Sequence, residues 1–236
     1  MFGIFSRKYS ILESGLLGMI EDRHSHILYG VDDGVRTEED SLTLLDWLHG
    51  LGLRTLWLTP HIMEDIPNTT EALRSRFDGL CLAAGPGISL HLAAEYMMDN
   101  LFERRLEEGD LLCMEDNTVL METSAWSSPY HLPDLLERTM RAGYRPLLAH
   151  PERYRYMEME DYRKLAGMGV RLQMNLPSLT GYYGRTERMK AVRLLSDGLY
   201  SFVGSDCHGM QSLKRIYSEK ALDRRTLDGI MKLAEA

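Results

Sequence analysis

The sequence predicts an α/β protein, a single-domain barrel of seven parallel strands with helices between them. Apolar runs rich in β-forming residues recur along the chain, and helical patterns fill the gaps, which is typical of repeated βαβ units. The length of 236 residues fits barrels of about 200 to 250 residues that fold as one domain. A hydrophobic fraction of 44% and a charged fraction of 26% indicate a globular protein with a sizeable core.

The expected strands and helices alternate along most of the chain. We expect strands over residues 18–24, 53–59, 88–95, 118–122, 145–150, 170–175 and 200–205. We expect helices over residues 37–50, 70–83, 132–142, 159–168, 185–197 and 224–235. Thr37 followed by Asp40 predicts the start of one helix, and Gly143 predicts the end of another. Residues 95–117 mix Met and Leu with charges, and they predict a helical excursion that covers the barrel.

The first residues predict neither a signal peptide nor a membrane span. They are mildly apolar, but Arg7, Lys8 and Glu13 interrupt them, so they contain no continuous apolar core. We therefore expect residues 1–17 to be an N-terminal extension and residues 18–236 to form the barrel.

Charge and cysteine content exclude several classes of function. A net charge of -8 argues against nucleic acid as the main partner, because a phosphate-binding surface needs a basic excess. Cys81, Cys113 and Cys207 are odd in number and far apart, which indicates a reducing cytosol and no disulfide framework. None of them begins a C-x5-R loop, so a phosphatase with a cysteine nucleophile is excluded.

The first candidate site is the segment DRHSHILYGVDDG, in which His24 and His26 lie at the end of an expected strand. Residues two apart on a strand point the same way, so both imidazoles can reach one ion. Asp32 and Asp33 follow in the loop, where glycines allow tight turns that return a carboxylate to the strand end. Taken alone, the pair fits equally well two surface histidines beside an acidic turn.

Residues of ligand type also occupy the carboxyl ends of the other expected strands, except the sixth. Because the active sites of such barrels lie at that end, we expect the set to converge on one mouth. The complete set of candidate ligands is His24, His26, Asp33, His61, Glu95, Glu122, His150, Asp206 and His208.

These nine residues are too many for one tetrahedral ion, whereas two or three divalent ions with a bridging carboxylate would use them all. Hydrolysis of a phosphate ester is the chemistry that this predicts. Arg153, in HPERY, can hold two phosphoryl oxygens, and the alternative is an ion pair with Glu152 or Asp161. Manganese is the expected metal, and iron and zinc accept the same ligands.

With H-x-H, the DDG turn, TPH, AEY, HPERY and SDCH in this order, the chain resembles the PHP (polymerase and histidinol phosphatase) superfamily. Within it, residues 22–208 are similar to the bacterial capsule and exopolysaccharide protein-tyrosine phosphatases of the CpsB and YwqE type. This resemblance implies a distorted (β/α)7 TIM-like barrel with a trinuclear metal centre. It also implies a cytoplasmic enzyme that dephosphorylates the tyrosine-rich tail of a membrane-bound tyrosine autokinase, which controls polysaccharide export. The oligomeric state, monomer or homo-oligomer, is left open.

Carried over residue by residue, the resemblance implies three sets of ligands. One ion would be bound by His24, His26, Glu95 and Asp206, a second by Glu95, Glu122 and His150, and a third by Asp33, His61 and His208. Asp33 is chosen because the family's ligand directly precedes the glycine of the turn, so Asp32 would support a ligand or the turn. Many relatives carry an arginine shortly after the final histidine, where this chain has Leu213, and Arg215 is the nearest substitute.

The expected mechanism is in-line attack of an activated water on phosphorus, with the ions and Arg153 neutralising charge on the equatorial oxygens. A histidinol-phosphate phosphatase, or another esterase for small phosphates, is the alternative enzyme and would need an enclosed pocket. The non-enzymatic alternative is a metal-stabilised binding module for the kinase tail, which turnover of an aryl phosphate would exclude.

Overall fold

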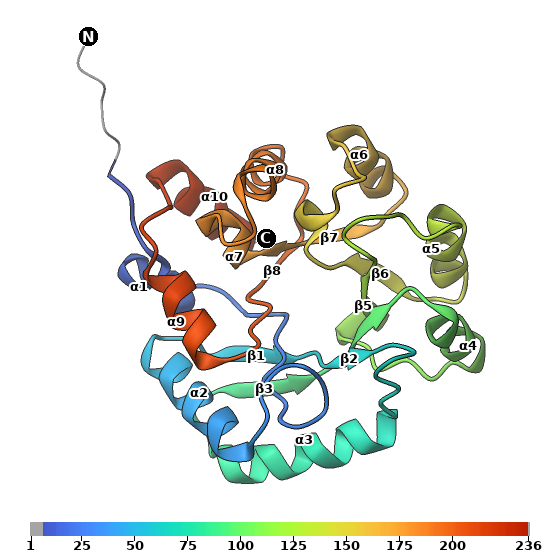
Figure 1. Cartoon of the computed structure of the whole chain (residues 1–236), viewed down its shortest axis with the longest axis horizontal. Helices are drawn as coiled ribbons and strands as arrows, with labels where there is room; N and C mark the ends of the chain where they lie inside the picture. The colour runs from blue at the N-terminus through green and yellow to red at the C-terminus, as the bar shows by residue number, and fades with distance from the viewer. Residues whose placement is uncertain (1–6, 236) are drawn as a thin grey trace.

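Parallel strands form a curled sheet at the centre of the molecule, and helices form a ring around it (Figure 1). The computed structural model describes residues 7–235. Its strands are β1 (Thr55–Leu58), β2 (His61–Ile62), β3 (Ser89–Leu92), β4 (Glu95–Met97), β5 (Thr118–Glu122), β6 (Arg145–Leu148), β7 (Arg171–Asn175) and β8 (Phe202–Gly204). Its α-helices are α1 (Ile11–Ser14), α2 (Glu38–Gly50), α3 (Thr70–Ala84), α4 (Asn100–Glu108), α5 (Leu132–Arg141), α6 (Met159–Gly167), α7 (Leu176–Thr180), α8 (Arg185–Ser196), α9 (Met210–Ser218) and α10 (Arg224–Ala234). Short 3₁₀ helices are η1 (Leu16–Gly18), η2 (Glu115–Asn117) and η3 (Pro151–Arg153).

The sheet consists of two parts that continue one another. β1 pairs with β3, and the order of the other part is β2-β4-β5-β6-β7-β8. Thr55 lies opposite Ser89 in the first part and His61 opposite Glu95 in the second, so the same two chain segments pair in one register across a short interruption. The predicted class, α/β with a parallel sheet, is therefore confirmed, and the sheet is a curled one.

The strand expected over residues 18–24 is wrong. η1 ends at Gly18, and beyond it the chain makes only isolated bridges, from Asp22 to Leu56 and from Ser25 to Cys207. The Asp22 carboxylate accepts hydrogen bonds from the backbone N–H groups of His24 and Ser205, at 3.3 and 2.8 Å. Such side-chain bonds to the backbone compete with a regular ladder. The segment 22–26 nevertheless hydrogen-bonds to the β1 side through Thr55 O and to the β8 side through Val203 O.

The remaining predicted strands are present with shifts of a few residues, as are the six predicted helices, and Thr37 caps α2 by accepting from Asp40 N. We expected residues 95–117 to form a helical excursion that covers the barrel, and this prediction is wrong. This stretch is an ordinary unit of β4, α4 and η2 before β5, and α4 lies in the outer ring (Figure 1). Asp99 caps α4 and Gly109 ends it in the left-handed region, which leaves enough residues for a normal crossover.

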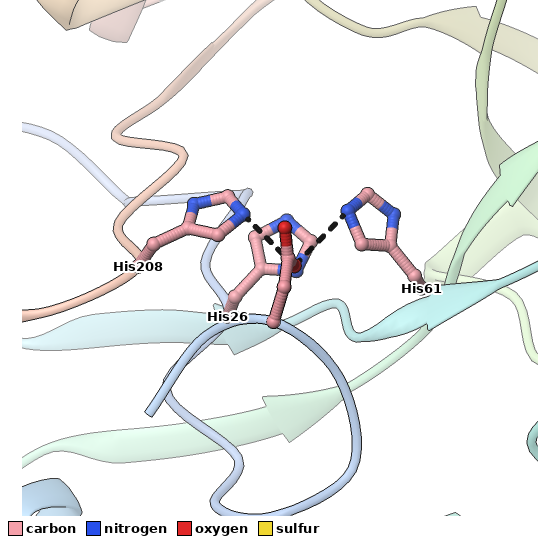
Figure 2. A group of neighbouring side chains, drawn as sticks. His26, His61 and His208 are labelled. Carbon is pink, nitrogen blue, oxygen red and sulfur yellow. Dashed lines mark ion pairs between the residues drawn. The ribbon is translucent and has the colours of Figure 1, made fainter. Parts of the chain in front are cut away.

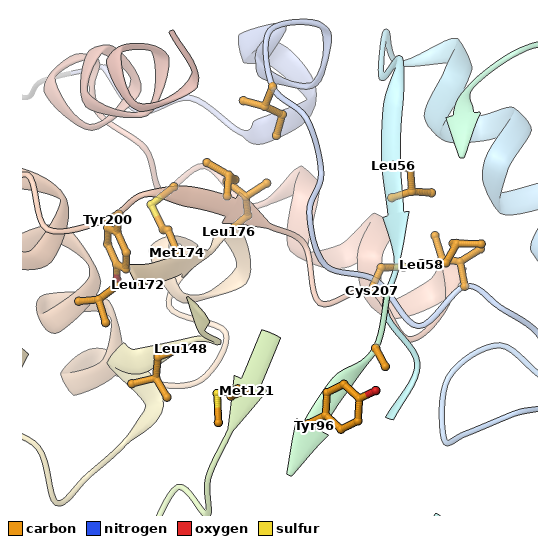
Figure 3. Packing of buried hydrophobic residues seen from close by; sticks show 14 of the residues in the cluster. Leu56, Leu58, Tyr96, Met121, Leu148, Leu172, Met174, Leu176, Tyr200 and Cys207 are labelled. Atoms are coloured by element: carbon orange, nitrogen blue, oxygen red, sulfur yellow. The ribbon is translucent and has the colours of Figure 1, made fainter. Parts of the chain in front are cut away.

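The core has two parts because successive residues of a strand point to opposite faces. Leu148 and Met121 belong to the large cluster between the sheet and the helices, part of which Figure 3 shows. Their neighbours Leu147 and Leu120 belong to a small cluster on the other face. Leu120 lies two residues before Glu122 on the same face of β5, so this inner cluster lies beneath the candidate ligands.

The N-terminal segment contributes to the core. α1 lies beside α9 (Figure 1), and Tyr9 pairs antiparallel with Leu222. Ile11, Leu16 and Leu17 are buried. The expected extension over residues 1–17 lies partly outside the described residues, which begin at residue 7. All three cysteines are free. None of the described helices is long and apolar enough to cross a membrane.

Candidate metal centre

The nine candidate ligands come together in one cluster near the carboxyl ends of the strands. Glu122 ends β5, His150 follows β6, and Asp206 and His208 follow β8. His61 begins β2, directly after β1. Seven of the nine are buried, and the side chains of His208 and Asp33 are 33% and 64% exposed. The cluster therefore opens to solvent on the side of His208 and Asp33.

His24 and His26 face each other through ring nitrogens that cannot hydrogen-bond to one another as neutral imidazoles. The Nδ1 atom of His24 is 2.7 Å from Gln173 Oε1, and Nδ1 of His26 is 2.7 Å from Asp32 Oδ2. Because both partners are acceptors, both Nδ1 atoms carry the proton, and both Nε2 atoms present lone pairs. These Nε2 atoms are 3.1 Å apart. A cation would bind both lone pairs, so this pair fits a metal ion.

Glu95 lies at the centre of the cluster. Its Oε1 atom is 3.0 Å from His150 Nε2. Its Oε2 atom is 3.3 Å from His24 Nε2, 3.4 Å from His26 Nε2 and 3.1 Å from His61 Nδ1. Glu95 Oε2 and His61 Nδ1 are buried and have no hydrogen-bond partner among the described residues. Buried polar atoms are rarely left unsatisfied, so this arrangement fits a carboxylate that bridges cations.

A second group of rings surrounds the carboxylate of Asp33. His61 Nε2 and His208 Nε2 lie 3.6 and 3.3 Å from Asp33 Oδ1, along the dashed lines of Figure 2. The ring of His26 stacks on that of His208, with centroids 4.1 Å apart. His61 also reaches Glu122, with Nδ1 3.2 Å from Oε1. His61 thus connects the Asp33 group to the Glu95 group.

The Asp206 carboxylate has one anchored oxygen and one oxygen directed at histidines. Oδ2 accepts hydrogen bonds from Arg153 Nη1 at 2.8 Å, Asn175 Nδ2 at 3.0 Å and the Tyr183 hydroxyl at 3.3 Å. Oδ1 lies 3.6 Å from His24 Nε2 and 3.5 Å from His26 Nε2. Three donors on one oxygen hold the carboxylate so that the other oxygen is available to a metal ion.

The loop with the DDG sequence places its two aspartates differently. Asp32 is the buried partner of His26 Nδ1, and it also accepts from the backbone N–H groups of Gly34 and His61, at 3.0 and 3.1 Å. Asp33 points toward His61 and His208. Gly34 is required because a Cβ atom there would lie 2.1 Å from His26 O. The loop is therefore packed directly onto the segment that carries His26.

The carboxylates of the cluster create a strong demand for positive charge. Burial by itself lowers the pKa of His26, but Asp32 and Glu95 outweigh it and raise this pKa to about 10. Burial likewise lowers the pKa of His61, while Glu122 and Glu95 raise it to about 11. Burial raises the pKa of Glu95, and its histidine neighbours hold this pKa well below its usual range. Divalent cations would supply that positive charge, and the histidines could then stay neutral and coordinate the cations through their lone pairs.

Sequence reasoning missed the residues that orient the ligands. Gln173 and Asn175 lie on β7, the strand treated as skipped, and contact His24 and Asp206. Their signal was available: two polar side chains two apart at the end of an otherwise apolar strand, the same spacing as His24 and His26. Tyr183 follows α7, outside any predicted strand, and no sequence pattern pointed to it.

The two predicted phosphate-binding arginines lie in different places. Arg153 contacts the cluster through Asp206, and its guanidinium lies 4.5 Å from the centroid of the Tyr183 ring. The alternative ion pairs with Glu152 and Asp161 are not the ones that Arg153 makes. Arg215 is exposed on α9, where its guanidinium lies 5.4 Å from the centroid of the Tyr182 ring. In the described structure, Arg215 has no ion pair with any of the nine candidate ligands.

Comparisons with known proteins point to one group. A family model described as capsular polysaccharide synthesis, CpsB/CapC, matches residues 20–221. The tyrosine-protein phosphatase YwqE of Bacillus subtilis is 29% identical over 208 residues, which cover 85% of this chain and 82% of YwqE. The tyrosine-protein phosphatase CpsB of Streptococcus pneumoniae is 29% identical over 222 residues, which cover 86% of this chain and 88% of CpsB. A crystal structure from work on YwqE and CpsB, described as metal-dependent tyrosine phosphatases, aligns with a TM-score of 0.75 at 25% identity. That alignment covers 92% of this chain and 86% of the other.

Proposed function

The chain belongs to the CpsB/CapC family of capsular polysaccharide synthesis proteins, and on that premise we propose that it is a metal-dependent protein-tyrosine phosphatase. The observation that carries the proposal is the pair of facing Nε2 lone pairs on His24 and His26, 3.1 Å apart and beside the bridging position of Glu95. When both rings are neutral, a cation that binds both lone pairs satisfies this pair. The two named relatives compared above, YwqE and CpsB, are tyrosine-protein phosphatases, and the aligned crystal structure comes from work on the same two proteins.

Eight of the nine candidate ligands form three overlapping groups, which share most members with the three sets that the resemblance implied but are not identical to them. His24, His26 and Asp206 have ligand atoms within 4.8 Å of one another, as do His26, Asp33, His61 and His208, and also His61, Glu95 and Glu122. We propose two to three divalent ions, with Glu95 as the bridge and His150 completing the set around Glu122. Manganese, iron and zinc all accept these ligands.

Divalent ions in such a site lower the pKa of water and neutralise charge on phosphoryl oxygens. The protein's own residues would bind and orient the substrate. Arg153 lies at the cluster and its side chain is 30% exposed, so its other N–H groups can donate to a phosphoryl oxygen while Nη1 remains on Asp206. Phenolate is a fairly good leaving group because tyrosine has a pKa of about 10. A protein-derived general acid is therefore not required by the chemistry.

The curled sheet and the segment 22–26 support the distorted (β/α)7 barrel that the resemblance implied. This segment hydrogen-bonds to the β1 side and to the β8 side, and so takes the place of the strand expected over residues 18–24. We propose that it completes the barrel and brings His24 and His26 to the same mouth as the other ligands. Residues 18–236 as the phosphatase domain and residues 1–17 as its extension remain a prediction.

For the substrate, we propose the phosphotyrosine tail of a membrane-bound tyrosine kinase, in the cytoplasm. The support is the family's description as capsular polysaccharide synthesis proteins and the open side of the cluster at Asp33 and His208. A histidinol-phosphate phosphatase would use the same ligands, but an open mouth favours a large substrate.

The test is to assay the purified protein with a phosphotyrosine peptide and with histidinol phosphate, and to measure bound metal in the same sample. We expect turnover of the peptide that depends on metal content. Preference for histidinol phosphate would favour the small-ester alternative. Stoichiometric metal with no turnover of either substrate, or of an aryl phosphate, would favour the binding module.

A further inference from the structure

We propose that an aromatic rim beside the metal centre, formed by Trp126, Tyr130 and Arg155, binds the polypeptide that flanks the phosphotyrosine. This inference rests on the proposed function. Trp126 and Tyr130 lie in the loop between β5 and α5, and Arg155 follows η3. Strand β5 ends at the candidate ligand Glu122, so the loop rises from the mouth of the site.

The two aromatic side chains are unusually exposed. Trp126 is 69% exposed and Tyr130 is 93% exposed. Scattered exposed apolar residues are ordinary. Here, however, two large rings lie in one loop at the mouth of the site. Aromatic rings offer a large contact area at a small cost in side-chain entropy, which is why they are enriched where proteins bind polypeptides.

Trp126 is held in place before any partner binds. The Arg155 guanidinium lies 4.0 Å from the centroid of the Trp126 ring. The backbone N–H of Arg155 donates to Ala125 O at 2.8 Å, and that of Trp126 donates to Ser124 Oγ at 3.2 Å. Arg155 Nε also lies 3.5 Å from Glu187 Oε1, which gives the guanidinium a second anchor. A preorganised ring loses little entropy on binding, which favours a recognition role.

The rim is continuous with the metal centre. Thr123 directly follows Glu122, and its hydroxyl is 2.6 Å from the hydroxyl of Tyr156. The backbone N–H of Thr123 also donates to the Tyr154 hydroxyl at 3.3 Å. Arg153 contacts the cluster through Asp206. Arg155, two residues later, contacts the Trp126 ring. A peptide whose phosphate lies at Arg153 would therefore run past the rim, whereas a small ester would not reach it.

The chemistry of the rim specifies one kind of occupant. The exposed parts of the Trp126 and Tyr130 rings fit an extended peptide with an apolar or aromatic side chain close to the phosphotyrosine. The rim should thus contribute to peptide affinity and leave the reaction at phosphorus unchanged. This separates it from Arg153, which lies at the reacting group.

The test compares a phosphotyrosine peptide, with leucine residues beside the phosphotyrosine, with 4-nitrophenyl phosphate on the metal-loaded protein. In the double variant Trp126→Ala/Tyr130→Ala, we expect KM for the peptide to rise roughly 5- to 30-fold, with kcat almost unchanged. The value of kcat/KM for 4-nitrophenyl phosphate should stay within about two-fold of wild type, because that ester ends before the rim. Leu82→Ala is the matched control, since Leu82 is 88% exposed near the end of α3 and lies outside the rim.

Several results would overturn the inference. An unchanged KM for the peptide would show that the rim does not bind it. An equal loss with both substrates would assign the residues to support of the site itself. A lower molar mass for the double variant than for the wild type in light scattering would show that a second copy of the chain covers the rim. If the wild type hydrolyses 4-nitrophenyl phosphate but not the peptide, the proposed function fails together with this inference. If the wild type hydrolyses the peptide and the double variant has the same KM, only the inference fails.

Discussion

The amide of Gln173 decides which nitrogen of His24 faces the cluster. Its Oε1 atom accepts from Nδ1 of His24, and its Nε2 atom donates to Arg23 O at 3.0 Å, which sets the direction of the amide. Partners of this kind fix the tautomer and the orientation of a ligand, and their loss costs about 10- to 100-fold in metal affinity. The metal centre therefore depends on side chains beyond the nine candidate ligands.

We expect Gln173→Leu to weaken metal binding by about 10- to 100-fold, because leucine cannot accept the proton of Nδ1. Titration of the metal-free protein with Mn²⁺, followed by isothermal calorimetry, measures the change. Gln211→Leu is the control, since Gln211 is exposed on α9. Wild-type affinity in Gln173→Leu would show that the tautomer of His24 is fixed by other means.

Arg153 binds Asp206 and, in the proposed function, also the phosphoryl group of the substrate. Replacing it with Lys keeps the charge but removes the two-pronged geometry, so kcat/KM for a phosphotyrosine peptide should fall clearly, and Ala should reduce it further. Loss of one contact that strengthens in the transition state costs on the order of 2 to 4 kcal/mol, roughly 30- to 1000-fold in rate.

Bound metal in the Arg153 variants should stay near the wild-type level, because Asn175 and Tyr183 still hold Oδ2 of Asp206. Metal analysis beside the kinetics decides this point. A loss of metal parallel to the loss of rate would assign Arg153 to the support of Asp206, and unchanged kinetics in Arg153→Ala would leave Arg215 as the next candidate for phosphate binding.

At the scale of elements, α10 begins at an aspartate cap that also connects to the N-terminal segment. The Asp223 carboxylate accepts from the backbone N–H of Thr226 at 2.9 Å and pairs with Lys8 at 3.0 Å. The hydrogen bond from Thr226 and, more weakly, Lys8 lower the pKa of Asp223 from 3.8 to about 2. The folded state thus favours the ionised carboxylate.

We expect Asp223→Ala to lower the free energy of unfolding at pH 7 by about 0.5 to 1 kcal/mol, the lower part of the range for N-caps because the side chain is 37% exposed. A pKa that is lower in the folded state contributes stability above the ordinary value, and this contribution is lost as the pH falls toward about 2. The difference between wild type and variant should therefore shrink from pH 4 downward.

Urea unfolding at several pH values measures this difference. Asp223→Asn serves as the comparison, since asparagine keeps the cap but has no carboxylate to titrate. A difference between wild type and Asp223→Ala that stays constant between about pH 5 and 3 would contradict the proposed role of the ionised cap.

On the scale of the whole molecule, the metal centre connects the segment 22–26 with β2, β4, β5 and the chain after β6 and β8, so bound ions should stabilise the entire fold. Ions that bind only the folded state at about 100 times their Kd contribute about 2.7 kcal/mol. For a chain of this size that corresponds to a rise in Tm on the order of 5 to 10 °C. Chelation should reverse the shift and abolish activity. The variant Glu95→Gln, measured with and without Mn²⁺, should show a much smaller shift, and an equal shift would place the bound ions elsewhere.

Alkylation of the cysteines should leave activity unchanged, in contrast to chelation of the metal ions. Burial raises the pKa of Cys113 to about 11, and it raises the pKa of Cys81 and Cys207 as well. Few thiolates are therefore present near pH 7, and the proposed chemistry uses none of them. Treatment with iodoacetamide, followed by mass spectrometry and activity assays, checks this. Loss of activity in proportion to modification of Cys207, with the fold intact, would count against the mechanism.

The sequence by itself determined the class of the fold and predicted which residues lie together in the cluster. Alternating apolar runs specify strands and helices locally, and the ends of parallel strands meet at one edge whatever the exact register. This is why residues as far apart as Glu122 and His208 could be assigned to one site from their positions. The turn at DDG was also predicted from the sequence, because glycines allow tight turns. The structure adds that Gly34 packs directly against His26.

Tertiary structure alone decided how that cluster is held. The first strand was lost because Asp22 hydrogen-bonds to the backbone N–H groups of His24 and Ser205, a competition that appears only once β8 is beside it. The partners of Asp206 come from three separate segments, at Arg153, Asn175 and Tyr183. Hydrogen bonds between such distant segments have no periodic signal in the chain, because they depend on how the strands and loops meet in space and not on the local preference of any one of them.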